Sequence, residues 1–236
     1  MAFTFVNSAS GTNGLVEGTS YTLAYTPDAG NGVFIIVGYL NGGGSPVTVA
    51  IASFANQNGT NIPFVLGDQV DASEFNYGQG LAWVPALPSG TTSITVTMAA
   101  TCSGGIGMAI IEFSGLSSTL SVDVQGASSL IAAPSTDTDA LVSPTVTPTG
   151  AADGAIVFGF AGSYSGFEAA GIGTGFTGAT ETIVSEGVYE YKRITSNASV
   201  AATWTANVSG HIYSPVVMVV DEPAASIDVC VSWFGL

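Results

Sequence analysis

The sequence predicts an all-β protein, an antiparallel β-sandwich of the jelly-roll type that is built from two similar halves. Three observations lead to this prediction. Apolar residues nowhere recur at the i, i+3, i+4, i+7 spacing of a helix for three turns. Glycine is abundant, with 31 residues in 236, whereas good helix formers are scarce. Short segments that alternate between apolar and polar residues are separated by turns rich in Gly, Pro and Asn.

The clearest strand pair lies between residues 90 and 116. Residues 93–98 alternate strictly, so that one face is apolar and the other carries Ser and Thr, as in a half-buried strand. Gly104-Gly105 then provides a turn. Residues 106–113 are almost wholly apolar, with Glu112 as the polar exception. This composition is expected of a strand that is covered on both faces.

The rest of the first half is predicted to form further strands, separated by turn signals such as the one at 27–32. Residues 55–80 lack a clean period and are predicted to form an exposed loop system. The segment from Leu81 to Leu87 lies beside two prolines, which favours an edge strand. The other expected strands are 3–6, 21–25, 33–39 and 47–54.

The second half repeats the first in outline. Four segments match in the same order: 154–160 resembles 32–38, 187–191 resembles 80–83, 198–204 resembles 92–98, and 215–221 resembles 109–112. Either two separate sandwiches or one jelly roll, in which each half supplies strands to both sheets, would give this order. The passage 132–150 has too little length and charge to separate two free domains, and each half has a thin core of its own. We therefore favour one jelly roll over residues 1–223, with halves of about 1–116 and 117–223.

The C-terminal residues 224–236 lie beyond the repeat. Their apolar side chains alternate with polar ones, which predicts one more strand. This strand could return to its own sheet as an edge, or it could act as an arm that adds to the sheet of a neighbouring subunit. The residues expected to carry such an arm are Ile227, Val229, Val231, Trp233 and Phe234.

The charge of the chain excludes several partners. The net charge is −15, and it comes from 17 acidic residues with only two basic ones, Lys192 and Arg193. Nucleic-acid binding through phosphate contacts and attraction to anionic membranes are therefore not expected. No run of 18 apolar residues and no signal peptide is visible. Because only 8% of the residues are charged while 47% are hydrophobic, part of the surface is expected to lie against copies of the chain or a partner.

The segment Ile111-Glu112-Phe113-Ser114-Gly115-Leu116, which ends a dry strand, resembles an element of a family of β-sandwich domains in phage virion proteins and bacterial surface proteins. In that family the core strand ends in Glu-Phe/Tyr-Ser-Gly, and a second half opens with a turn similar to Ala152-Asp153-Gly154. The resemblance covers roughly residues 32–220. It implies a structural or adhesive role in a virion or at a surface, and it carries no catalytic signature.

No catalytic constellation is found. His211 is the sole histidine and lies in a predicted hairpin turn, without a Gly-x-Ser-x-Gly element. Residues 173–178 match the Gly-x-Gly-x-x-Gly fingerprint, but no helix follows to bind a pyrophosphate. Cys102 and Cys230 are too few for a zinc site and are not expected to form a disulfide framework. The chain is therefore predicted not to be an enzyme and to need no cofactor.

Two kinds of ligand site remain open at this point. Asp68 and Asp71 are weak candidates for a calcium ion, because hard oxygen ligands suit this cation, although solvated loop acids are the default interpretation. Aromatic residues on strands could stack on a glycan, although strand aromatics more often belong to the core. The candidates for glycan stacking are Trp83, Tyr189, Tyr191 and Trp204.

These observations lead to one functional expectation and one alternative. The first is a non-catalytic, self-assembling structural protein of a phage virion, either capsid-decorating or tail-associated, with copies of itself and other virion proteins as partners. The alternative is a carbohydrate-binding or adhesin module that is extracellular or displayed on a cell surface.

Overall fold

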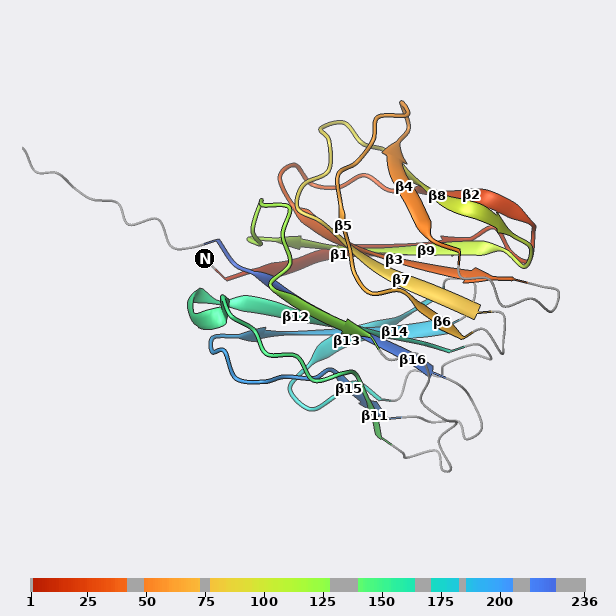
Figure 1. Cartoon of the computed structure of the whole chain (residues 1–236). Coiled ribbons are helices and arrows are strands. Elements are labelled where there is room, and N and C mark those ends of the chain that lie inside the picture. The colour runs from red at the N-terminus through yellow and green to blue at the C-terminus, as the bar shows by residue number, and fades with distance from the viewer. Residues whose placement is uncertain are drawn as a thin grey trace, which may run out of the picture.

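The structure is a computed structural model that describes residues 2–41, 49–72, 77–127, 140–163, 171–182, 186–205 and 213–223. Its regular structure is almost entirely antiparallel β-sheet, with one short 3-10 turn, η2 (Ala151–Asp153). The predicted all-β sandwich class is therefore confirmed. The strands form two larger sheets, which we name A and C, and two smaller sheets, B and D. The sheets are stacked as layers in the order B, A, C and D, so that the two larger ones are internal (Figure 1).

The first half of the chain forms sheets A and B. Sheet A has the strand order β1-β9-β3-β7-β5, and β6 also pairs with β7. Its strands are β1 (Thr4–Thr12), β3 (Gly32–Leu40), β5 (Val65–Leu66), β6 (Val70–Ala72), β7 (Tyr77–Val84) and β9 (Ile106–Ser114). Sheet B has the order β2-β8-β4. Its strands are β2 (Gly18–Ala24), β4 (Ile51–Asn56) and β8 (Ser93–Cys102).

The second half forms sheets C and D. Sheet C has the order β10-β16-β12-β14-β13, and sheet D consists of β11 and β15. The strands of sheet C are β10 (Val124–Ala127), β12 (Ala155–Ser163), β13 (Thr177–Thr182), β14 (Glu186–Ile194) and β16 (Tyr213–Asp221). Those of sheet D are β11 (Ala140–Val142) and β15 (Thr203–Thr205).

The internal repeat expected from the sequence corresponds to equivalent places in the two halves. In both inner sheets the last strand of the half lies between an edge strand and the first dry strand: β9 between β1 and β3, β16 between β10 and β12. The matched segments of the sequence fall on β3 and β12, β7 and β14, β8 and β15, and β9 and β16. The register agrees as well, because Val33 pairs with Glu112 and Ala155 pairs with Asp221.

The strand pairing departs from the jelly roll favoured above. Among the described residues, every strand pairs within its own half, so sheets A and B come from the first half and sheets C and D from the second. The halves are nevertheless not separate bodies, because sheets A and C pack face to face on a shared core. Each half also has a hydrophobic core of its own, so the expectation of thin core material in each half was wrong. The contact between sheets A and C covers the second face of each inner sheet.

Three local predictions were wrong. Residues 77–80 belong to the buried strand β7 rather than to an exposed loop, and β7 is an interior strand between β3 and β5. Gly78 and Gly80 have no side chain, so the alternating pattern of this strand is not visible in the sequence. Glycine is needed at these positions because a Cβ would overlap the side chains of Tyr39 and Ile51. Strand β1 also continues to Thr12, beyond the strand expected at residues 3–6.

Three hydrophobic cores separate the four layers. One core lies between sheets B and A and contains Phe54, Ile94 and Met108 among others. The central core lies between sheets A and C and is rich in aromatic residues. The third core lies between sheets C and D around Trp204. Because strands such as β3 are buried on both faces, they are apolar throughout, as their sequences indicated.

Candidate functional site: the junction of the two halves

The Glu-Phe-Ser-Gly element of strand β9 begins with a buried carboxylate. Glu112 accepts hydrogen bonds from the hydroxyl of Tyr25 at 2.5 Å, the backbone N–H of Asp28 at 2.9 Å and the side-chain amide of Asn31 at 2.7 Å. All three donors lie in the segment between β2 and β3. Burial and the neighbouring carboxylate raise the pKa of Tyr25, so its hydroxyl stays a donor. Glu112 therefore fixes the connection between an outer and an inner sheet, and it is structural.

Phe113, the next residue of this element, lies in the aromatic cluster between the two halves. Its ring meets Phe158 of the second half edge-on at 6.4 Å and Tyr191 at 4.8 Å. Phe34 of β3 stacks on Phe158 with the ring planes 6° apart and the centroids 4.2 Å apart. Aromatic pairs at such distances contribute about 0.5–1.5 kcal/mol beyond their burial. The central core therefore joins the halves through specific ring contacts.

The two segments that carry the family resemblance, 111–116 and 152–154, each contain a glycine that lies very close to other atoms of the chain. Gly115 has φ +78°, and a Cβ there would meet the backbone of Ala2 and Phe3. Gly154 has φ +116°, and a Cβ there would meet the side chains of Glu222 and Arg193. Both positions thus favour glycine for its conformation and for the space it leaves. Each of these close approaches lies within one half, so the Ser-Gly and Asp-Gly steps are required by the packing of each half beside the junction.

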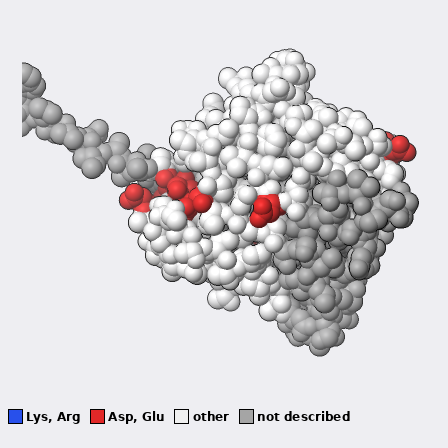
Figure 2. Space-filling model, in the orientation of Figure 1, with Lys and Arg blue, Asp and Glu red and all other residues white. Residues whose placement is uncertain are grey.

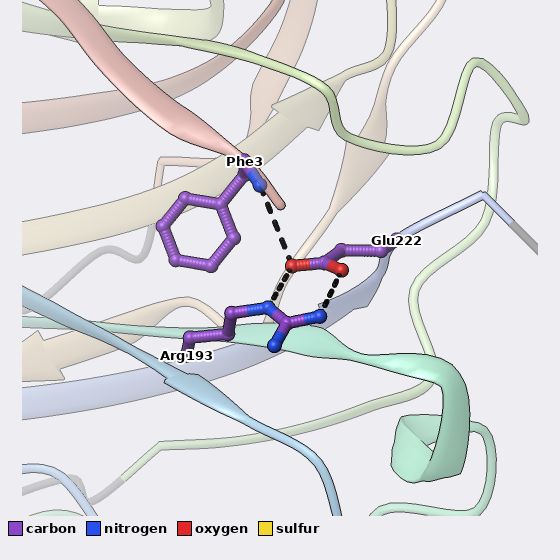
Figure 3. Close-up of polar contacts among 3 residues, drawn as sticks. All are labelled: Phe3, Arg193 and Glu222. Carbon is purple, nitrogen blue, oxygen red and sulfur yellow. Dashed lines mark hydrogen bonds and ion pairs between the residues drawn. The ribbon is translucent and has the colours of Figure 1, made fainter. Parts of the chain in front are cut away.

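An ion pair closes this junction. Arg193 of β14 donates from Nε and Nη2 to the two carboxylate oxygens of Glu222, at 2.5 and 2.6 Å (Figure 3). The backbone N–H of Phe3 also donates to Glu222, at 3.4 Å. The bond to Glu222 raises the pKa of Arg193. One buried carboxylate therefore connects the N-terminal strand of the first half with two strand ends of the second, in the bidentate geometry that favours arginine.

Both basic side chains of the sequence are engaged within the chain. Arg193 pairs with Glu222, and the ammonium group of Lys192 lies 4.1 Å from the ring centroid of Phe176, in a cation–π contact. Figure 2 shows one face of the molecule on which the few acidic residues are scattered among uncharged ones and no basic residue is seen.

We predict that the native chain resists trypsin. Its only two cleavage sites follow Lys192 and Arg193, which lie in β14 between β12 and β13. Cleavage therefore requires local opening of an interior strand. Digestion followed by electrophoresis should show an intact native chain and two fragments after denaturation. Glu222→Gln, which removes the charge that holds Arg193, should be cut faster than the wild type. Equal cleavage rates for native and denatured chains would contradict the structure of this region.

A third buried carboxylate lies on β14, the strand that also carries Lys192 and Arg193. Glu190 of β14 is fully buried, and its two oxygens accept hydrogen bonds from the backbone N–H groups of Gly173 and Thr203, both at 2.7 Å. Its cross-strand neighbours are glycines on both sides, Gly159 and Gly178. Burial raises the pKa of Glu190 to about 7, although the two hydrogen bonds and Lys192 act in the opposite direction. Glu190 therefore connects segment 171–173 and β15 to sheet C.

The calcium candidates are not brought together with further acids in the described structure. Asp68 is exposed in the connection between β5 and β6, and Asp71 lies on β6, where only the backbone is described. Among the described residues, no group of three or more His, Cys, Asp or Glu side chains could hold a metal ion. Solvated or structural acids thus remain the interpretation of the described carboxylates.

Three of the four candidates for glycan stacking are core residues. Trp83, Tyr189 and Trp204 are at most 3% exposed and contribute to the central and third cores, so they present no ring face to a sugar. Their place on inner strands or on the inner face of sheet D explains this burial. Tyr191 is half-buried and stacks on Phe5, which is 37% exposed at the rim of the central core.

Several sequence predictions lie outside the described residues. These are the arm residues Ile227, Val229, Val231, Trp233 and Phe234, together with His211 and Cys230. Cys102 is a free, buried thiol, and burial raises its pKa to about 11. Residues 173–178 run from a loop into β13, so no helix follows the glycine-rich fingerprint. In the described part of the chain, no helix is long and apolar enough to cross a membrane.

The ion pair of the junction and the buried Glu190 were not predicted from the sequence. One signal was present: the only two basic residues of the chain are adjacent and directly follow the repeated segment 187–191, which indicates a specific partner for at least one of them. The comparisons with known protein families and with curated proteins found no match to this chain.

Proposed function

We propose that the chain is a non-catalytic structural protein of a virus particle, a capsid-decorating or tail-associated protein of a phage that assembles with copies of itself and with other virion proteins. The observation that supports this proposal most directly is the use of the charged side chains. Glu112 and Glu190 fix connections between layers, and Glu222 links the two halves through the N–H of Phe3. Both basic residues are engaged in contacts within the chain. These charged side chains stabilise the fold itself. Because the chain has few other charges, much of its surface is uncharged and suited to contacts with other subunits.

The resemblance of the Glu112–Leu116 element to phage virion and surface β-sandwich proteins supports the same proposal. In this chain its Glu, Phe and Gly have structural roles: fixing a connection, filling the central core and admitting the N-terminal backbone. These are structural roles, as expected of a motif in a structural protein.

The proposed role is tested by locating the chain. Mass spectrometry of purified particles should detect it in fixed stoichiometry to a capsid or tail protein, and antibodies against it should label particles. Genes for capsid or tail proteins are expected beside its own gene. Absence from particles that are produced while the chain is expressed would contradict the proposal.

The alternative is a carbohydrate-binding or adhesin module at a cell surface. The aromatic pair formed by Phe5 and Tyr191, which is accessible at the rim of the junction, favours it, because accessible rings can stack on sugars. A binding module should be monomeric in size-exclusion chromatography and retained on a glycan surface, and Phe5→Ala should abolish the retention. A multimeric chain without retention would favour the virion role.

We predict that residues 224–236 are needed for assembly. The last described residues, Glu222 and Pro223, are anchored at the junction of the halves, so the segment that follows starts from a fixed point. Deleting residues 224–236 should leave a folded monomer, because no described contact of the body requires them, while the assembly is lost. Sedimentation measures the assembly and circular dichroism the fold. Assembly that survives the deletion would rule out an intersubunit arm.

A further inference from the structure

A ladder of five nearly parallel aromatic rings runs from the central core to the surface. Its rings are, in order, Phe34, Phe158, Tyr189, Tyr191 and Phe5. Successive ring planes are 6° to 14° apart, and successive centroids are 4.2 to 6.4 Å apart. The first ring is fully buried, whereas the last one, Phe5, is 37% exposed. The outer end of the ladder is therefore accessible to a further ring.

The ladder is open at Phe5 because no described strand covers this edge of the central core. Strand β13 pairs with β14 only as far as Tyr191, opposite Thr177, so the rest of β14 has no partner on this side among the described residues. Strand β1, which carries Phe5, pairs only with β9 in the described part of the chain. Tyr189, in the region that β13 covers, is 3% exposed, whereas Tyr191 is half-buried. Free strand edges beside accessible rings suit the binding of an extended segment.

Residues 224–236 follow the described body next to this open end. Glu222 accepts a hydrogen bond from the backbone N–H of Phe3, at 3.4 Å, and Phe3 is two residues before Phe5. Figure 1 likewise shows the end of β16 beside the start of β1. The segment that follows Pro223 therefore starts from a point close to the last ring of the ladder.

The segment carries side chains of the kind that would continue the ladder. Its apolar residues alternate with polar ones and so share one face of an extended chain; they are Ile227, Val229, Val231 and Trp233. Only one of its residues, Asp228, is charged. The apolar face can cover the open edge of the central core, and the indole ring of Trp233 can stack on the last ring of the ladder.

The extended conformation predicted for residues 227–233 decides which copy of the chain they reach. In this conformation they span about 20 Å, and no Gly, Pro or Asn within them favours a turn. In the same chain, Phe5 lies within about 7 Å of Phe3, whose N–H bonds to Glu222. An extended segment that starts beside Glu222 therefore carries Trp233 past its own ladder and toward that of a neighbouring copy.

We propose that residues 227–233 of one copy bind at the open end of the ladder in a second copy, where the ring of Trp233 stacks on that of Phe5. This inference rests on the proposed function, since it names the place to which the predicted arm binds. The other apolar residues of the arm cover Tyr191 and the edge of the central core. Because every copy carries both an arm and an open end, two copies can exchange arms, and the two contacts then strengthen each other.

Sedimentation velocity of the full chain from about 1 μM to about 1 mM tests the proposal. The wild type should associate over this range. Phe5→Ala and Trp233→Ala each remove one ring of the contact and should weaken the association roughly tenfold or more. Phe5→Tyr keeps a ring and should preserve the association. The matched control is Leu15→Ala, at an apolar position between β1 and β2 that is 76% exposed, and it should change nothing. Circular dichroism checks that each variant is folded.

An equal mixture of the Phe5→Ala and Trp233→Ala chains tests which copy supplies the arm. In a mixed pair, the intact arm of the first chain meets the intact ring of the second, so one of the two contacts is restored. The mixture should therefore associate more strongly than either variant alone. A mixture that associates no more strongly than the separate variants would show that each arm binds its own chain, which overturns the proposal.

Three further results would overturn this inference. They are a wild type that stays monomeric throughout, unchanged association in Phe5→Ala or Trp233→Ala, and equal weakening in Leu15→Ala. A monomeric chain whose retention on a glycan is lost in Phe5→Ala but kept in Trp233→Ala would assign the open end of the ladder to sugar binding instead. The virion role is decided separately, by the mass spectrometry of purified particles described above.

Discussion

Replacing Phe158 with alanine is expected to lower the free energy of unfolding by about 3–5 kcal/mol, the usual cost of removing a buried phenylalanine side chain. Phe158 is fully buried between sheets A and C. It stacks on Phe34 and Tyr189, at 4.2 and 5.8 Å between centroids, and meets Phe113 edge-on. The substitution leaves a cavity where the two halves meet, between the hydrogen-bonded strands of sheets A and C.

Chemical denaturation followed by tryptophan fluorescence measures this effect. The chain has three tryptophans, so the measurement uses variants that keep one of them. Trp83 reports on the first half and Trp204 on the second, and both are buried. Because the halves share the central core, one transition is expected at both tryptophans, in the wild type and in Phe158→Ala. Phe5→Ala is the matched control at the exposed rim of the same cluster and should cost much less. Two separate transitions, or equal costs for Phe158 and Phe5, would contradict a shared core.

The stability of the protein is expected to fall as the pH rises between about 4.5 and 7, because of Glu190. Burial raises the pKa of this carboxyl in the folded chain from 4.5 to about 7. The folded state therefore binds more protons than the unfolded state in this window, so its stability is highest at the acid end and decreases as Glu190 ionises. The contribution between pH 5 and 8 is on the order of 2 kcal/mol.

Glu190→Gln should remove this part of the pH dependence, since the amide cannot ionise. Urea denaturation of both proteins at pH 5 and 8 gives the comparison, and the difference between the proteins isolates Glu190 from the other acids. Hydrogen exchange of Gly173 and Thr203, whose N–H groups bond to Glu190, should show where the fold loosens at high pH. The exposed Glu17→Gln serves as control. A wild-type pH dependence that persists in Glu190→Gln would show that the carboxyl titrates normally.

The strands that are buried on both faces could be predicted because such burial requires a continuous run of apolar residues, which is visible in the sequence. The apolar runs at 33–39 and 106–113 became β3 and β9, and 154–160 became β12. Strand β7 was partly missed because Gly78 and Gly80 lack side chains, and a missing side chain carries no hydrophobic pattern. Strand aromatics were expected to belong to the core, and the burial of Trp83 and Trp204 confirms this. Because both rings are buried, they are not available to stack on a glycan.

The junction of the halves could not be predicted to the same degree. Arg193 and Glu222 are 29 positions apart, and Phe3 and Glu222 are 219 apart. No spacing rule connects residues at such distances, because their contact depends on how sheets A and C lie on each other. The same is true of Glu190, whose burial depends on the position of segment 171–173 and β15.

The amino-acid sequence by itself determined the all-β class, the order of most strands, the internal repeat and the scarcity of cations, because alternation, turn residues and charge are local or additive properties of a chain. The tertiary structure decided that each half keeps its own sheets, that the two inner sheets share one aromatic core, and that the charged residues of the strands lie in those inner sheets. These features depend on which faces meet, and many pairings of apolar faces satisfy the same local pattern.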